Sequence, residues 1–145
     1  MVGWGPDKGQ AEAFARHAEI PNVEICGPVD YEQMPCVYDA ADLTVVPSLP
    51  SRFWQEQYGR VVVESQACGT PVLASRTGGI PYAMGDHGVL AQPGDPHDWT
   101  EKICSLLSDS TRRNRLGRKA RAHVESERTI ENTARQVEAV YDDLT

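Results

Sequence analysis

The sequence predicts an α/β fold: a Rossmann-like parallel sheet with helices on both faces. Short apolar runs rich in β-branched residues alternate with helical segments along the chain. Runs such as LTVVP at 43–47 and PVLAS at 71–75 are typical of buried parallel strands. Alternation of strand and helix is the pattern of such a sheet. The length of 145 residues predicts one domain with a single core over residues 1–145.

The elements of the first half follow from local signals. Pro35 suits the first turn of a helix, where its missing N–H has no intrahelical partner. Gly69 is placed to end a helix in the left-handed conformation that glycine adopts without strain. We expect a helix at 9–18, a strand at 22–26, a helix at 35–41, a strand at 43–47 and, after the irregular SLPSRFWQEQY, a helix ending at Cys68.

The second half continues the alternation. Asp95-Pro96 reads as an N-cap followed by a first-turn proline. Ile130, Ala134, Val137 and Tyr141 recur at helical spacing, and an exposed apolar stripe of this kind would favour self-association. We expect a strand at 71–75, a glycine-rich loop at 77–82, a strand at 87–92 and helices from Asp95 to about 107, at 111–126 and at 130–143.

Ligands of open parallel sheets bind beyond the carboxyl ends of the strands. The loops to inspect therefore follow Pro47 and Ser75 and lie near Gly27. Almost no strand precedes the first turn, MVGWG, so we expect the domain's first strand and helix to lie ahead of residue 1.

The composition argues against several classes of protein. A net charge of −7 argues against nonspecific nucleic-acid binding. No apolar run approaches the roughly 20 residues that span a bilayer, and no secretory signal opens the chain. A cytoplasmic protein is expected, with peripheral attachment to a membrane as the alternative. The cysteines and histidines lack metal-ligand spacing, so no metal site and buried free thiols are expected.

The sharpest motif is E-x7-E, formed by Glu56 in a loop and Glu64 about two turns into the next helix. Glu64 lies on a small apolar face, where a carboxylate is costly to bury unless it is hydrogen-bonded. Sugar and ribose hydroxyls are suitable partners, because both carboxylate oxygens accept hydrogen bonds. The alternative is an ion pair with Arg60, one turn earlier, in the weaker i,i+4 orientation.

Two glycine-containing turns lie at the predicted ligand edge. At Tyr58-Gly59 a loop becomes a helix, so free N–H groups and the helix dipole favour anionic or hydroxyl oxygens there. Gly78 and Gly79 offer a second loop with exposed amides after a strand. The alternative for Gly59 is an ordinary turn glycine. The alternative for Gly78 and Gly79 is a tight connection between strand and helix.

These residues resemble the C-terminal domain of retaining glycosyltransferases of family 4 (group 1), which have the GT-B fold. The resemblance runs from residue 2 to the end of the chain, and its middle block is the most specific part. The matching pieces are NVEICGPV at 22–29, YDAADLTVVPS at 38–48, EQYGRVVVESQACGTPVLAS at 56–75, GGIP, and GVLAQPGD at 88–95.

The resemblance implies a UDP-, GDP- or ADP-sugar donor held between two Rossmann-like domains, the N-terminal one absent here. It implies transfer to a saccharide or lipid acceptor with retention, without a metal and with no cofactor besides the donor. By position, Glu56 is the catalytic candidate at the donor sugar, and the amides of Tyr58 and Gly59 assist at sugar and phosphate. Glu64 would hold the ribose hydroxyls, and Val29 would lie by the base.

The chain also departs from the family. The Arg and Lys that bind the donor diphosphate cannot be assigned, and Lys8 is no convincing substitute. Tyr82 stands where the family usually continues GGIP with a glutamate.

Three interpretations stay open. The chain is part of an active glycosyltransferase, inactive alone. Alternatively, it is a short, non-catalytic nucleotide-sugar-binding or partner-dependent module. The third is a domain of another GT-B enzyme, such as a phosphorylase or an epimerase, although neither a cofactor lysine nor an acid and base pair is found. A hydrolase with two carboxylates ranks lower, because Glu64 inside a helix is better placed to bind than to protonate.

Overall fold

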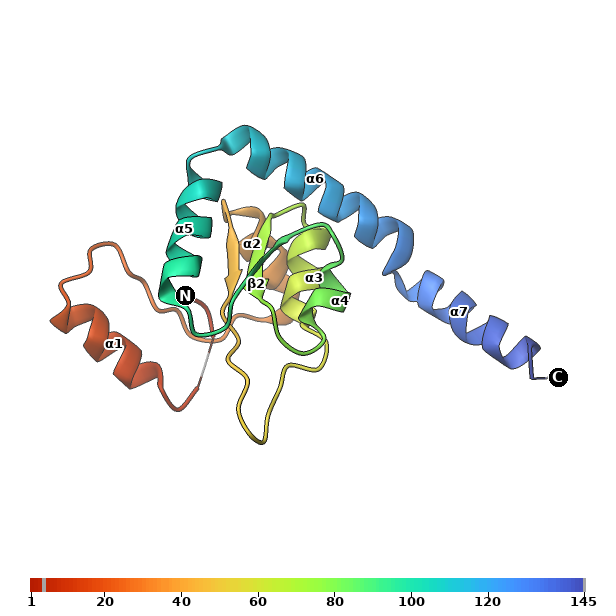
Figure 1. The fold of residues 1–145 in the computed structure, drawn as a ribbon, viewed down its shortest axis with the longest axis horizontal. Coiled ribbons are helices and arrows are strands. Elements are labelled where there is room, and N and C mark those ends of the chain that lie inside the picture. Colours follow the sequence, from red (N-terminus) through yellow and green to blue (C-terminus); the bar gives the residue numbers. More distant parts are fainter. Residues whose placement is uncertain (4, 145) are drawn as a thin grey trace. The chain divides into compact units, whose positions relative to one another are not determined.

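A parallel sheet of three strands organises the second part of the described chain (Figure 1). β1 (Thr44–Val46) pairs with β2 (Val72–Ser75), and β2 pairs on its other edge with β3 (Val89–Ala91). Helix α3 (Arg60–Ala67) joins the first two strands, and α4 (Ile80–Met84) joins the second pair. Strands that follow one another in chain order and in space, with a helix in each crossover, form βαβ units.

The computed structural model describes residues 1–3 and 5–144. These residues form two compact units, 1–34 and 35–145, and each is described by itself. The expectation of one domain over the whole chain stays a prediction. The remaining elements are α1 (Lys8–His17), a 3₁₀ turn (Tyr31–Gln33), α2 (Met34–Asp39), α5 (Pro96–Leu107), α6 (Ser110–Glu127) and α7 (Ile130–Asp142).

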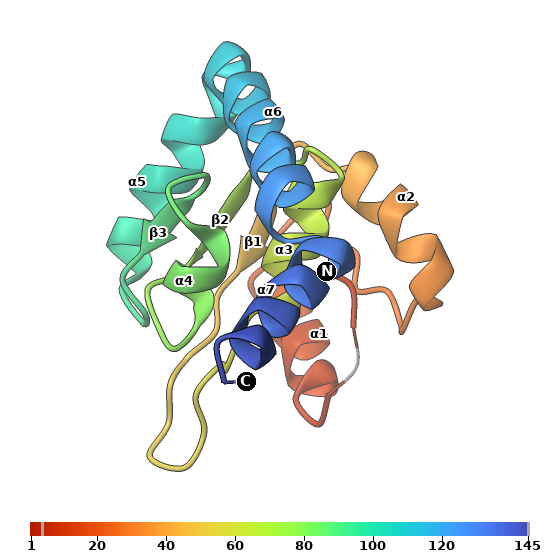
Figure 2. The ribbon, with the colours of Figure 1, turned by 90° about the vertical axis from the view of Figure 1, so that its right-hand side faces the viewer.

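Side chains of β2 alternate between two apolar layers. Val72 and Ala74 pack with residues of α3 and α4, among them Ile80, on one face. Leu73 packs with Leu106 of α5 on the other face. This alternation follows from the two-residue period of a strand. Helices therefore cover both faces, as Figure 2 shows, and the predicted fold class is confirmed.

Capping side chains mark the starts of α5, α6 and α7. The Asp95 carboxylate accepts hydrogen bonds from the His97 and Asp98 amides, which confirms it as an N-cap. Asp109 and Thr129 cap α6 and α7 in the same way. Gly69 ends α3 with a φ of +78°, the predicted left-handed conformation.

Helix α6 packs closely against the end of α3. Gly117 lies so near Gly69 that a Cβ atom at Gly117 would overlap the Gly69 carbonyl oxygen. No residue of α7 is buried, and Val137 and Tyr141 are exposed. Among the described residues, no helix is both long and apolar enough to cross a bilayer.

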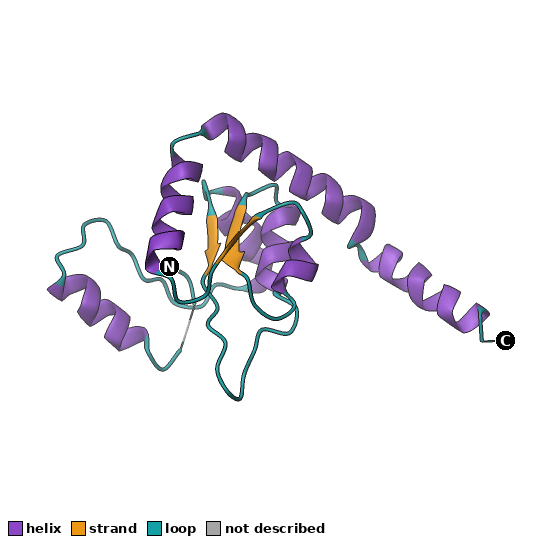
Figure 3. Cartoon of the chain, in the orientation of Figure 1, coloured by secondary structure: helices purple, strands orange, loops and turns teal. Residues whose placement is uncertain are grey.

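Four sequence predictions need correction. Residues 22–25 form no strand, and only Cys26 bridges to Val2, because the segment has no second partner along which to form a ladder. The loop predicted at 77–82 becomes helix α4 at Ile80, with Pro81 in its first turn (Figure 3). The helix predicted at 35–41 is present as α2, but it begins one residue earlier, after the 3₁₀ turn, and ends at Asp39. All four cysteines are free thiols, but none is buried: Cys26 and Cys68 are half-buried, and Cys36 and Cys104 are exposed.

Candidate active site

A hollow of about 330 Å³ lies at the carboxyl end of β1 and the start of α3. Its position agrees with the rule that ligands of parallel sheets bind beyond the carboxyl ends of the strands. The loop that follows β1, yellow in Figure 1, supplies most of its wall. The lining residues are Val46, Glu56, Gln57, Tyr58, Gly59, Arg60 and Val61.

The Glu56 carboxylate folds back onto the start of α3. Its Oε1 accepts a hydrogen bond of 3.1 Å from the Gly59 amide and a longer one of 3.4 Å from the Tyr58 amide. Its Oε2 accepts none from the residues that the structure describes. The amides expected to face a ligand are thus partly engaged by Glu56, while one oxygen of Glu56 stays available.

Gly59 has two reasons to be glycine. Its φ of +83° lies in the left-handed region, which side chains rarely adopt. A Cβ atom there would also lie 3.1 Å from Cγ1 of the buried Ile80. Gly59 therefore permits both the turn into α3 and the close packing of α4.

The Gly78-Gly79 pair packs against the Glu56 loop. The Gly79 amide donates a 2.9 Å hydrogen bond to the backbone carbonyl of Glu56. A Cβ atom at Gly78 would overlap that carbonyl oxygen, and one at Gly79 would overlap the carbonyl oxygen of Gln57. The tight-connection alternative accounts for both glycines, and the Gly79 amide is not free for a ligand.

Both oxygens of the Glu64 carboxylate have protein partners. The Tyr38 hydroxyl donates to Oε2 across 2.9 Å, and the Arg60 guanidinium donates to Oε1 across 3.2 Å. The Glu64 side chain is 24% exposed. The Arg60 pair considered as the alternative is thus present, and Tyr38 is a partner that sequence reasoning missed. It lies 26 residues away, so no local spacing pointed to it.

Three further positions considered from the sequence are described each within its own unit. Val29 is half-buried in the first unit, so its role by the base stays a prediction. Lys8 pairs loosely with Glu12 at 3.8 Å. Tyr82 is exposed, with the Arg128 guanidinium 4.5 Å from its ring centroid.

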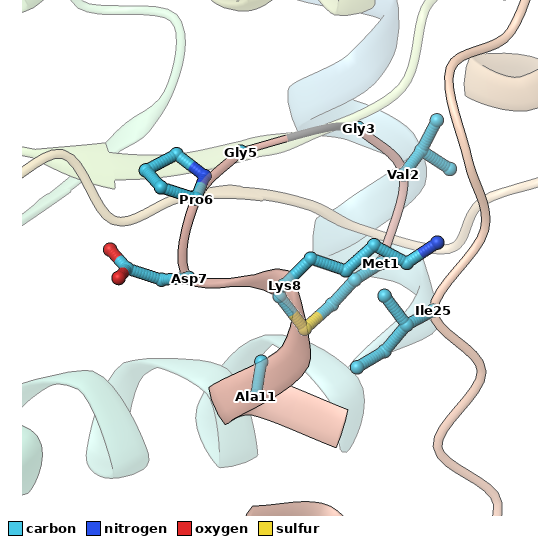
Figure 4. Close-up of a pocket in the computed structure, with 9 residues that line it drawn as sticks. All are labelled: Met1, Val2, Gly3, Gly5, Pro6, Asp7, Lys8, Ala11 and Ile25. Carbon is cyan, nitrogen blue, oxygen red and sulfur yellow. The ribbon is translucent and has the colours of Figure 1, made fainter. Parts of the chain in front are cut away.

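A second hollow, of about 290 Å³, lies within the first unit. In Figure 4 the Asp7 carboxylate points away from the Met1 and Ile25 side chains. No motif in the sequence pointed to this hollow, which is lined mainly by apolar atoms of the unit's opening turn.

The described residues include no cluster of three or more His, Cys, Asp or Glu suited to a metal ion. Cys68, at the end of α3, is the thiol closest in sequence to Glu64. Burial, followed by the negative charge of Asp39, raises the pKa of this thiol. Cys68 is therefore a neutral thiol rather than a nucleophile at neutral pH.

A parallel α/β sheet with helices on both faces and a loop-to-helix hollow at its carboxyl edge defines a Rossmann-like domain. The family model described as glycosyl transferases group 1 matches residues 1–123. The chain belongs to this family, and its resemblance to group 1 glycosyltransferases is confirmed.

Relatives of known name agree with this family assignment. The D-inositol 3-phosphate glycosyltransferase of Corynebacterium kroppenstedtii is 38% identical over 135 residues, which cover 91% of this chain and 29% of the relative. That of Segniliparus rotundus is 44% identical over 93 residues, covering 63% of this chain and 20% of the relative. The chain thus spans less than a third of these relatives.

Solved structures share the fold. Sucrose-phosphate synthase from Thermosynechococcus elongatus has a TM-score of 0.83 at 29% identity, over 99% of this chain and 37% of that one. The C-terminal domain of a group 1 family protein from Francisella tularensis has a TM-score of 0.70 at 24% identity, over 85% and 63%. Anabaena HepE, solved with UDP-glucose, has a TM-score of 0.83 at 22% identity, over 98% and 40%. The last two likenesses show the fold alone.

Proposed function

We propose that this chain carries the donor-binding site of a retaining glycosyltransferase that uses a nucleoside diphosphate sugar. The observation that carries the proposal is the hollow at the carboxyl end of β1, walled by Glu56, Tyr58 and Gly59. It lies in a group 1 glycosyltransferase chain, at the edge where parallel α/β sheets bind ligands.

Glu56 is proposed to bind the hydroxyl groups of the donor sugar near the reacting carbon. The Gly59 amide holds Oε1 in place, and Oε2 is free of partners among the described residues, so it can accept sugar hydroxyls. The 3.4 Å bond from the Tyr58 amide is the one most readily shared with a phosphate oxygen. The positive end of α3 adds to the attraction of this site for phosphate.

Glu64 is proposed to bind the ribose hydroxyls. A carboxylate offers about four lone-pair positions. Tyr38 and Arg60 each occupy one, on different oxygens, so both oxygens can still accept a hydroxyl. Val29 is proposed to lie by the base, and the Gly78-Gly79 loop to support the site through its contact with Glu56.

The chemistry proposed is stabilisation of the departing diphosphate and of an oxocarbenium-like sugar, without a metal, by groups fixed in advance. We also propose that acceptor binding and turnover need a second Rossmann-like domain, because the chain spans only 29% of a relative such as that of C. kroppenstedtii. The names of the relatives make D-inositol 3-phosphate the first acceptor to test in a longer protein.

Calorimetric titration of the chain tests the proposal. UDP, GDP, ADP and their glucose or mannose conjugates are added in the absence of metal. We expect saturable binding of one nucleotide, at least tenfold weaker in Glu64→Ala because a charged hydrogen-bonding partner is lost. Glu101→Ala, an exposed glutamate of α5, is the matched control and should bind normally. Absence of saturable binding for every nucleotide would overturn the proposal.

A further inference from the structure

The hydroxyl of the buried Tyr38 donates a 2.9 Å hydrogen bond to the Glu64 carboxylate. Tyr38 belongs to α2, whereas Glu64 belongs to α3, so the bond joins two helices. Tyr38 is 5% exposed, which makes the bond costly to leave unmade.

The two partners of Glu64 differ in how firmly they restrain it. The Arg60 side chain is 72% exposed, and exposed ion pairs of this kind contribute little and reorient easily. Tyr38, by contrast, is held inside the unit. The orientation of the Glu64 carboxylate therefore depends mainly on Tyr38.

Tyr38 is itself anchored through its backbone. The Thr70 hydroxyl donates to the Tyr38 carbonyl oxygen across 2.7 Å. The Thr70 amide in turn donates to the Ser65 carbonyl oxygen of α3 across 3.1 Å. Both ends of the Tyr38–Glu64 bond are thus tied to the same segment, so the hydroxyl and the carboxylate keep one geometry before any ligand arrives.

We infer that Tyr38 is a positioning residue that orients Glu64 to accept hydrogen bonds from a ribose diol, and thereby sets a preference for ribonucleotides over deoxyribonucleotides. This inference rests on the proposed function. A diol bonds two carboxylate oxygens only in a restricted orientation, so a carboxylate free to rotate would discriminate less well. Tyr38 acts through Glu64 and needs no contact with the ligand.

The test compares affinities for one nucleotide with those for its 2′-deoxy and 3′-deoxy forms. UDP, GDP and ADP are titrated first, and the tightest binder supplies the deoxy analogues. We expect the unaltered chain to prefer the ribonucleotide about tenfold, and Tyr38→Phe to reduce that preference about three- to tenfold. Tyr141→Phe, an exposed tyrosine of α7, is the matched control and should keep the full preference.

The ratio of ribo- to deoxyribonucleotide affinity separates positioning from general damage, since a merely structural defect would weaken both ligands alike. Glu64→Gln changes the acceptor of the same hydrogen bond. It should lower the ratio of ribo- to deoxyribonucleotide affinity even if Tyr38→Phe folds poorly. An unchanged ratio in folded Tyr38→Phe would overturn the inference and leave the proposed function standing. An unchanged ratio in folded Glu64→Gln would overturn the inference together with the proposed ribose contact on which it rests. Failure of the unaltered chain to bind any nucleotide would overturn both.

Discussion

The Gly79 amide donates a 2.9 Å hydrogen bond to the backbone carbonyl of Glu56, so the turn after β2 holds the loop after β1. These loops lie at the carboxyl ends of neighbouring parallel strands. The glycine pair therefore shapes the candidate site by supporting Glu56 rather than by presenting free amides.

Gly79→Ala should destabilise the chain by about 1–3 kcal/mol, the usual effect of inserting a methyl group into a filled space. The φ at Gly79 is −79°, so backbone strain makes no contribution and the overlap with the Gln57 carbonyl is the whole cause. Urea unfolding measures the change. Gly27→Ala, which meets no atom within 4 Å, should cost far less, and equal losses in the two variants would contradict the assignment.

Gly117→Ala should also lower the free energy of unfolding, although alanine is favoured over glycine inside a helix by about 1 kcal/mol. The added methyl group would meet the Gly69 carbonyl oxygen and push α6 away from the end of α3. Thermal unfolding followed by circular dichroism reports the effect. Gly9→Ala, in α1 with open space around it, should be neutral or stabilising. A stabilised Gly117→Ala would show that the helices do not pack as described.

Stability should decrease as the pH falls below about 6.5, in part because of His123. Burial, followed by the neighbouring His87, lowers the pKa of His123 from its ordinary value of 6.5. The two rings are stacked with centroids 4.3 Å apart, and the His123 side chain is 9% exposed. Because the unfolded chain binds a proton more readily than the folded one, this stabilising contribution is present above pH 6.5 and is lost on acidification.

Urea unfolding at pH 7 and pH 5 measures the loss, and His123→Gln should reduce the difference between the two values. Glu127 raises the His123 pKa and Arg128 lowers it, so they oppose each other as smaller influences. An unchanged dependence in His123→Gln would rule out this residue as a source.

Much of the fold followed from patterns that act over a few residues. The strands at 44–46 and 72–75, the Asp95 cap and the left-handed Gly69 were predicted because their signals lie within one turn or one strand. Of the two strands, only 72–75 is buried, whereas 44–46 is partly exposed. The strand at 22–26 was predicted wrongly, because a strand also needs a partner ladder that no local pattern reports.

The candidate site shows the same limit. Spacing alone identified Glu64 and its i,i+4 neighbour Arg60, but Tyr38 reaches Glu64 only because the fold brings together two residues 26 positions apart in the sequence. The Gly78-Gly79 pair follows the carboxyl end of β2, as predicted. Its close approach to the Glu56 loop depends on the parallel pairing of β1 and β2, which a single sequence does not display.

The central claim is that Glu56 serves the sugar and Glu64 the nucleotide of one bound donor. The most direct test is calorimetry of the unaltered chain, Glu56→Gln and Glu64→Gln, each with a nucleoside diphosphate and with its sugar conjugate. Glu56→Gln should lose about tenfold in affinity for the conjugate alone, whereas Glu64→Gln should lose about as much for both ligands. Equal losses for both ligands in Glu56→Gln, or binding unaffected by either change, would contradict the account.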